Sequence, residues 1–207
     1  ICVICGSRRE VPVKIAIVQA GDPVLRKVAR KMSVDEIKSR ATQDLIELMC
    51  ETMRAAPGVG LAAPQIGESL QLAVIEDRVD YIKDIPPEKL AEFRRRAVDF
   101  HVIINPKLTI VGDTRVDFFE GCLSVAGFAA VVSRGESVRV ECLNERAEPV
   151  TITAHGWHAR ILQHEIDHLN GTLYIDRMHS RSFTSVENVD LFWRNRTIDQ
   201  VVSELDL

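Results

Sequence analysis

The residues best suited to do chemistry are His164, Glu165 and His168, which stand in the pentapeptide His-Glu-Ile-Asp-His. On a helix, two histidines four residues apart lie on one face. Two neutral imidazoles at that spacing can bind one divalent metal ion. Glu165 would point about 100° further round the helix, close to the ion without being forced to coordinate it. That is where a general base for a water on the metal is expected.

The simplest non-catalytic explanation is a pair of solvent-facing histidines beside a glutamate in a salt bridge. The segment has an apolar side that overlaps the histidine face through Ile161, and that side consists of Trp157, Ile161, Leu162, Ile166 and Leu169. Buried histidines and a buried glutamate need partners, and a metal ion supplies one for each imidazole. We therefore expect a central, buried helix over residues 156–170, ended by Gly171.

A catalytic metal site usually has three protein ligands and an open position, so a third ligand is needed. A third histidine six residues after His168 would fall at Tyr174, and that pattern fails. The spacing leaves open a distant glutamate such as Glu187. Cys122 follows a glycine at the end of a β-rich run, and a thiolate is a strong ligand for Fe(II) or Zn(II). Taken alone, however, Cys122 fits a buried core cysteine better.

The remaining sequence predicts the elements that must position these residues. Ser33 and Glu36 form a capping box, and an apolar pattern then predicts one helix over 33–56. A charged surface helix is expected over 86–96, where the arginines of 94–96 would form a solvated face. A weak helical pattern covers 198–205. Short β-rich runs between turn signals predict strands at 70–75, 102–104, 108–111, 116–119, 129–132, 138–142 and 150–153.

These elements indicate an α+β fold: a single domain over 1–207, with short antiparallel or mixed sheets around the central helix and a helix near the N-terminus. The 207 residues are 46% apolar and 27% charged, which is ordinary for a globular protein. The net charge of −4 gives no reason to expect direct nucleic-acid binding. No apolar run approaches the roughly 18 residues that span a bilayer, so we expect no membrane span.

The N-terminal sequence carries weak signals. The chain does not begin with methionine, so we expect it to be processed or trimmed, and a missing targeting segment then shows little. Five scattered cysteines favour a reducing compartment over a disulfide framework. Cys2 and Cys5 form a single CxxC without a second pair, and we expect incidental cysteines there.

Three segments together resemble the ordered motifs of the peptide deformylases: Gly-Val-Gly-Leu-Ala-Ala-Pro-Gln at 58–65, Glu-Gly-Cys-Leu-Ser at 120–124 and Gln-His-Glu-Ile-Asp-His at 163–168. The resemblance spans roughly residues 13–180 and leaves 181–207 as a tail of undetermined role. It implies a hydrolase that removes the N-formyl group from the initiator methionine of nascent peptides and releases formate. Formyl-methionyl nascent peptides are then the expected substrates, and the ribosome is a further candidate partner.

The resemblance also implies roles for single residues. It makes Cys122, His164 and His168 the metal ligands. It makes Glu165 the general base and acid, with Gln65 and the backbone N–H of Leu123 stabilising the oxyanion. It places Gly60 where the family hydrogen-bonds the substrate backbone. An apolar methionine pocket is expected, with candidate walls at Val59, Trp157 and Ile161.

The expected cofactor is one divalent metal ion. The resemblance favours Fe(II), with Zn(II), Ni(II) or Co(II) as substitutes, and the ligand set itself does not choose among them. Gly156-Trp157 and Arg181-Ser182-Phe183 resemble the organellar type. We therefore expect a mitochondrial location first and a plastid second, with the bacterial cytoplasm as the alternative.

The sequence departs from the family at Ala129, where many members carry arginine, and at Ser133-Arg134-Gly135, which lacks an aromatic often found after the arginine. We expect altered contacts with the peptide away from the metal. Two other functions remain open: an HExxH metallopeptidase with a different third ligand, and a non-catalytic homologue that keeps the metal.

Overall fold

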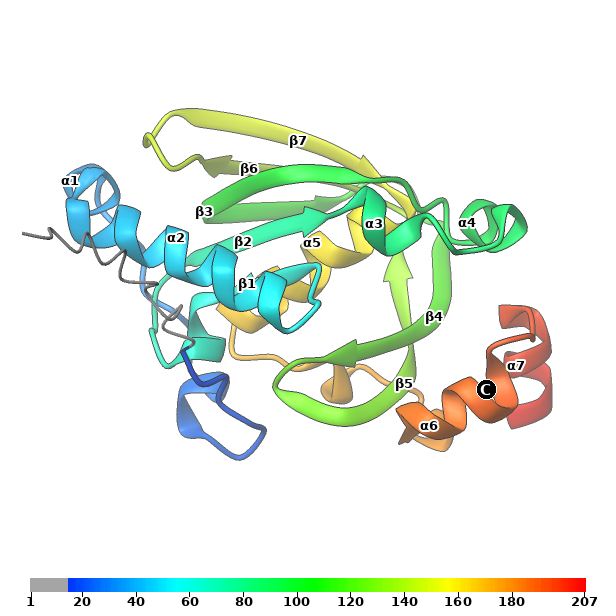
Figure 1. The fold of residues 1–207 in the computed structure, drawn as a ribbon. Coiled ribbons are helices and arrows are strands. Elements are labelled where there is room, and N and C mark those ends of the chain that lie inside the picture. Colours follow the sequence, from blue (N-terminus) through cyan, green and yellow to red (C-terminus); the bar gives the residue numbers. More distant parts are fainter. Residues whose placement is uncertain (1–14) are drawn as a thin grey trace, which may run out of the picture.

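Helix α5 (Gly156–Leu169) lies between two antiparallel sheets in the computed structural model, which describes residues 15–207 (Figure 1). It packs against strands of both sheets. Its apolar side chains, Leu162 and Ile166 among them, enter a core with Ile75, Ile103 and Val140 of the larger sheet. The expected α+β class is therefore confirmed, and α5 ends one residue before the expected boundary.

The larger sheet covers one side of α5, and its spatial order is β1-β2-β3-β6-β7. Its side chains alternate where one face is solvated: in β6, Val138, Val140 and Cys142 are buried while Arg139 and Glu141 are exposed. β1 is an edge strand and pairs antiparallel with β2. The strands are β1 (Gly60–Ala62), β2 (Leu72–Asp77), β3 (Val98–Ile110), β6 (Ser137–Leu143) and β7 (Pro149–His155).

The smaller sheet lies on the other side of α5 and has the order β4-β5-β8. β4 (Arg115–Cys122) and β5 (Val125–Gly135) form a hairpin whose turn is Leu123-Ser124. β8 (Thr184–Ser185) pairs with Ala129 and Phe128 of β5. Cys122 thus stands at the end of a strand, with a register irregularity between Gly121 and Cys122.

The single helix expected over 33–56 is wrong, because two helices occupy the segment: α1 (Val34–Lys38) and α2 (Arg40–Ala55). Ser39 separates them in extended conformation, and its hydroxyl accepts a hydrogen bond from the Thr42 N–H. A serine that caps a new helix competes with continuation of the old one. The capping box at Ser33 is present as expected.

The helix expected over 86–96 is also shorter, because α4 (Pro87–Glu92) ends before the arginines. Arg94 adopts φ 45°, which turns the chain. Arg95 then reaches the fully buried Asp77 through two hydrogen bonds of 2.8 and 2.9 Å. The arginines of 94–96 therefore do not form one solvated face, because Arg95 pairs with the buried carboxylate of Asp77.

The strands expected at 102–104 and 108–111 belong to one strand, β3, with a register shift between Ile104 and Lys107. Asn105 lies in the shift with φ 51°, and its side chain exchanges two hydrogen bonds with the backbone of Met32.

Around the two sheets stand the shorter elements η1 (Pro23–Arg26), η2 (Ala63–Ile66), α3 (Val79–Ile82), η3 (Tyr174–Asp176), η4 (Ser180–Ser182), α6 (Val186–Asn188), the π-helical η5 (Val189–Trp193) and α7 (Ile198–Leu205).

The paired cysteines near the N-terminus and the expected lack of a membrane span complete the comparison with the sequence. Cys2 and Cys5 lie outside the residues that the structure describes. Within residues 15–207, none of the helices has the length and apolar character needed to cross a membrane.

Candidate metal centre and adjoining pocket

Three donor atoms from two elements meet beneath the larger sheet. Cys122 comes from the end of β4, and His164 and His168 come from successive turns of α5. Their ligand atoms lie within 4.8 Å of one another, and Cys122 Sγ is 3.2 Å from His168 Nε2. One thiolate and two imidazoles this close can hold a divalent ion of the Fe(II) or Zn(II) type.

Glu120 sets the orientation of His164. Its Oε2 lies 3.0 Å from His164 Nδ1, which leaves Nε2 of that ring facing the other donors. A contact between a carboxylate and the ring nitrogen that does not face the metal is typical of metal-binding histidines, because it fixes the ring and its tautomer. Burial opposes the charge on Glu120, but hydrogen bonds from Arg134 and His164 outweigh it and hold the pKa of Glu120 well below its usual range.

The two histidines differ in their pKa, and only His164 carries an extra proton that a metal ion would displace. Burial lowers the pKa of His168 well below its usual value, which keeps its imidazole neutral. Burial also opposes the charge on His164, but hydrogen bonds to Cys122 and Glu120 raise its pKa. Metal ions displace such protons when they bind thiolate and imidazole, so the site fits a divalent ion on its own donor chemistry.

A buried ionic network supports the centre, and none of its members is among the predicted site residues. Arg134 donates two hydrogen bonds of 2.9 Å to Glu120 and also pairs with Asp167. Arg160 donates to the same carboxylate at 2.7 Å and lies over the ring of Phe118. For Arg160 and Asp167, the available signal was a charged residue within a helix that has an apolar side, because a buried charge needs a partner.

Glu165 occupies the position expected for a proton carrier. Its side chain is 4% exposed, and burial raises its pKa to about 7. Its Oε2 has no hydrogen-bond partner among residues 15–207. Gly60 of β1 lies directly against it, since a Cβ added to Gly60 would overlap the carboxylate. The group is therefore packed on one side and free to accept a proton on the other.

Gln65, in η2, is fixed at both ends of its amide. Its Oε1 accepts a 2.8 Å hydrogen bond from the Ala62 N–H, and its Nε2 donates to Ser124 Oγ at 3.3 Å and to Cys122 Sγ at 3.5 Å. The amide donor therefore faces the thiolate side of the centre. Leu123 follows Cys122 in the hairpin turn, and both Gln65 and Leu123 line the pocket beside the donors.

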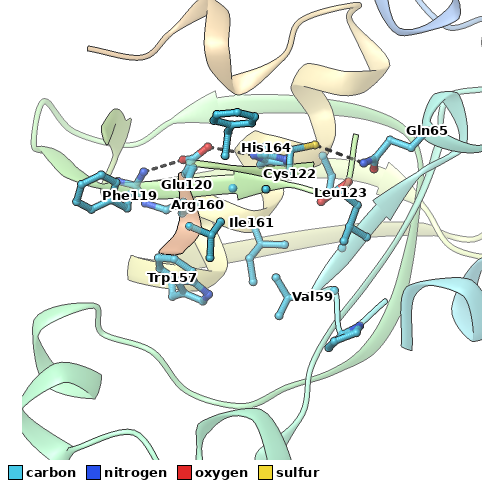
Figure 2. A pocket seen from close by; sticks show the side chains of 18 residues that line it. Val59, Gln65, Phe119, Glu120, Cys122, Leu123, Trp157, Arg160, Ile161 and His164 are labelled. Atoms are coloured by element: carbon cyan, nitrogen blue, oxygen red, sulfur yellow. Dashed lines mark hydrogen bonds and ion pairs between the residues drawn. The ribbon is translucent and has the colours of Figure 1, made fainter. Parts of the chain in front are cut away.

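A pocket of about 300 Å³ opens beside this centre. Figure 2 shows Glu120, His164, Cys122 and Gln65 along one side of it, with Trp157, Ile161 and Val59 on the side opposite. Its lining includes every predicted site residue except His168, which lies 1% exposed behind the others. The lining residues that the sequence did not predict include Phe119, Phe128 and Val186.

Other acidic and histidine side chains lie away from the donors. Glu187 is exposed on α6 and is outside the donor cluster, whose third member is Cys122. His158 has its ring centre 5.2 Å from that of His101. His179 lies 3.7 Å from Asp117.

Comparison with known proteins gives consistent matches. A sequence model described as "Polypeptide deformylase" matches residues 14–183. The chain is 51% identical over 175 residues to peptide deformylase 1A, chloroplastic, of Solanum lycopersicum, covering 84% of this chain and 63% of that protein. It is 40% identical over 170 residues to the mitochondrial peptide deformylase of Homo sapiens, covering 82% and 70%. The chain thus spans less than two thirds of the length of the tomato protein.

Solved structures show the same fold. A class I type b peptide deformylase from Acinetobacter baumannii with Met-Ala-Ser bound is 30% identical, with a TM-score of 0.71 over 81% of this chain and 99% of that chain. The enzyme from Thermotoga maritima is 34% identical, with a TM-score of 0.65 over 80% and 97%.

Proposed function

The chain belongs to the polypeptide deformylase family, and we propose that it hydrolyses the N-formyl group of formyl-methionyl nascent peptides and releases formate. One observation carries the proposal: the buried carboxylate of Glu165, which lines the same pocket as Cys122 and His164, has an oxygen without a hydrogen-bond partner in the described part of the chain. We place the catalytic core at about 13–180 and the tail at 181–207.

We propose that Cys122, His164 and His168 hold one divalent ion, with Fe(II) ahead of Zn(II), Ni(II) and Co(II). The proximity of the donors and the contact between Glu120 and His164 support the ligand set. The preference for iron rests on family resemblance. When bound, such an ion polarises a carbonyl and acidifies water, which makes a nucleophile available near neutral pH.

Glu165 moves the proton. As water attacks the formyl carbon, the Glu165 carboxylate accepts a water proton, and it then gives that proton to the amine nitrogen as the C–N bond breaks. The products are formate and a free amino terminus. A pKa of about 7 suits both transfers, because Glu165 can then both accept and donate a proton readily at neutral pH.

Gln65 Nε2 and the Leu123 N–H stabilise the negative oxygen that develops on the formyl carbon. The bonds of Gln65 to Ala62 and Ser124 support this role, because they fix the amide before substrate arrives. A preorganised donor of this kind contributes about 2.7–4 kcal/mol to lowering a barrier.

The pocket walls select the substrate. Gly60 lies in the edge strand β1, whose backbone can hydrogen-bond an extended peptide. Val59, Trp157 and Ile161 form an apolar wall that suits a methionine side chain. The Acinetobacter baumannii relative was solved with Met-Ala-Ser, a peptide that begins with methionine, and this supports the same substrate class here.

Formate release from a formyl-Met tripeptide, with anaerobically Fe(II)-loaded protein, tests the function. We expect turnover by the wild type and a loss of about 100- to 10,000-fold in Glu165→Ala, with melting temperature and metal content retained. Full turnover by Glu165→Ala would disprove its role. Cys122→Ser should lower the metal content, whereas a metallopeptidase with another third ligand would keep it.

We propose an organellar location, the mitochondrion before the plastid, supported by the plant and human relatives. Bacterial relatives keep the bacterial cytoplasm as the alternative. Immunoblotting of purified organelles from the source organism tests this. Association with ribosomes is a separate proposal, supported by the exposed side chains of Arg94 and Arg96, and co-sedimentation with ribosomes at low and high salt tests it.

A further inference from the structure

The tail contributes to the pocket. The family match ends at Phe183, yet Val186 lies three residues later and lines the same pocket as Cys122 and Glu165. Val186 begins α6, directly after β8. A wall of the pocket therefore comes from a segment that the family match does not cover.

Several contacts hold this segment in place. Thr184 and Ser185 pair antiparallel with Ala129 and Phe128 of β5, and the Ser185 hydroxyl caps α6 by accepting from the Asn188 N–H at 3.3 Å. Beyond α6 the chain continues through η5 to α7, which lies below α4 in the view of Figure 1. There the Ile198 N–H donates to Glu92 Oε1 at 2.8 Å. The tail is thus tied down on both sides of Val186.

Phe128 stands beside Val186 and is also fixed. Its ring stacks on Phe183, with centroids 5.0 Å apart and planes 10° apart, and its carbonyl accepts from the Tyr174 hydroxyl at 3.1 Å. Both Phe128 and Val186 line the pocket, yet 44% and 43% of their surfaces are exposed, against 4% for Ile161. Ile161 therefore lies deep in the pocket, and Phe128 and Val186 lie at its mouth.

A peptide whose first residue reaches the donors must leave through the mouth. Its methionine side chain then packs against the deep wall at Ile161, and the side chain of the next residue contacts Phe128 and Val186 at the mouth. We propose that Phe128 and Val186 form an apolar rim that contacts the residue after methionine, so that peptides with a large apolar second residue are preferred. This rests on the proposed function and adds a specificity determinant to it.

The test compares formyl-Met-Leu-Ser with formyl-Met-Gly-Ser, which lacks the second side chain. We expect wild-type kcat/KM to be about three- to tenfold higher for the leucine peptide, as one or two buried methylene equivalents would give at a half-exposed site. Val186→Ser and Phe128→Ser should each reduce that ratio towards one, whereas Val186→Ile should keep it. Leu191→Ser, a 72% exposed tail residue outside the pocket lining, is the matched control and should behave as wild type.

The outcomes separate the two proposals. If the wild type releases no formate from either peptide, the proposed function fails. If the wild type turns over both peptides equally, only the rim is overturned. An unchanged ratio in Val186→Ser, or an equal loss for both peptides, also overturns the rim, because a general disturbance of the fold would not discriminate between second residues.

Discussion

Gly60 and Glu165 fit each other so closely that a methyl group on Gly60 would overlap the Glu165 carboxylate. Gly60 belongs to the edge strand β1 and Glu165 to α5, so the approach of these two elements depends on the missing side chain. The same strand faces the pocket, and Gly60 therefore limits both where the carboxylate lies and how near a peptide can come.

Gly60→Ala should displace Glu165 and lower kcat/KM at least about 100-fold, since small misplacements of catalytic groups cost that much. Metal content should stay at the wild-type level, because Gly60 is not one of the three donors and the atoms nearest to an added Cβ all belong to Glu165. The check is a double-mutant cycle. In a Glu165→Ala background, Gly60→Ala should add little further loss, whereas two additive losses would show that Gly60 acts elsewhere.

Glu120→Gln should destabilise the protein, because Arg134 and Arg160 would remain buried opposite a neutral amide. Breaking a buried charge pair typically costs about 3–5 kcal/mol of unfolding free energy. Metal affinity should fall about 10- to 100-fold as His164 loses its orienting carboxylate. Urea unfolding and competitive metal titration measure the two effects.

Glu141→Gln is the matched control for Glu120, since Glu141 pairs with Arg139 on the surface, with side chains 51% and 55% exposed. Surface pairs contribute about 0–1 kcal/mol, so this variant should stay near wild type. Equal stability changes in the two variants would contradict a structural role for the Glu120 network.

Gln65→Leu should lower kcat about 100- to 1,000-fold with metal content retained, because the variant loses a donor to the developing oxyanion and none of the ligands. Ser124→Ala should cost less, since Ser124 only helps to hold the Gln65 amide. Stopped-flow or continuous formate release gives kcat, and elemental analysis gives the metal. A loss of metal in Gln65→Leu would instead show that its bond to Cys122 maintains the site.

His158 should make the stability fall in mild acid. Burial, with a smaller effect of His101, lowers its pKa to about 4, and burial also lowers the pKa of His101. The arginines of 94–96 line one space beside His158, and Glu145 and Arg146 line another. Below about pH 6.5 the unfolded chain binds protons that the folded chain does not.

The free energy of unfolding should therefore decrease as the pH falls from about 6.5 to about 4, by up to about 1.4 kcal/mol per pH unit for His158. His158→Leu removes this contribution. The difference in unfolding free energy between wild type and His158→Leu, measured by urea at pH 7.5 and pH 5, should shift by about 1–2 kcal/mol in favour of the variant. Parallel pH profiles would show that His158 is already protonated in the folded state.

Several features follow from the sequence because they depend on neighbours along the chain. The pentapeptide 164–168 places two imidazoles and a carboxylate by helical spacing alone, and α5 has nearly the expected bounds. Ser33 and Glu36 cap each other across one turn, and Gly171 adopts φ 72° after the helix. Local patterning gave the α+β class, while Ser39 was missed because its competing cap lies inside an otherwise continuous apolar pattern.

Only the tertiary structure decided which residues from distant parts of the chain meet at the metal centre and the pocket. The approach of Cys122 to His168, separated by 46 residues, depends on how the β4–β5 hairpin packs on α5. Glu120, Arg134 and Arg160 become one network only when β4, β5 and α5 meet, because a buried charge selects its partner in space and not in sequence. Val186 also lines the pocket through a tertiary contact, because the pairing of β8 with β5 sets its position.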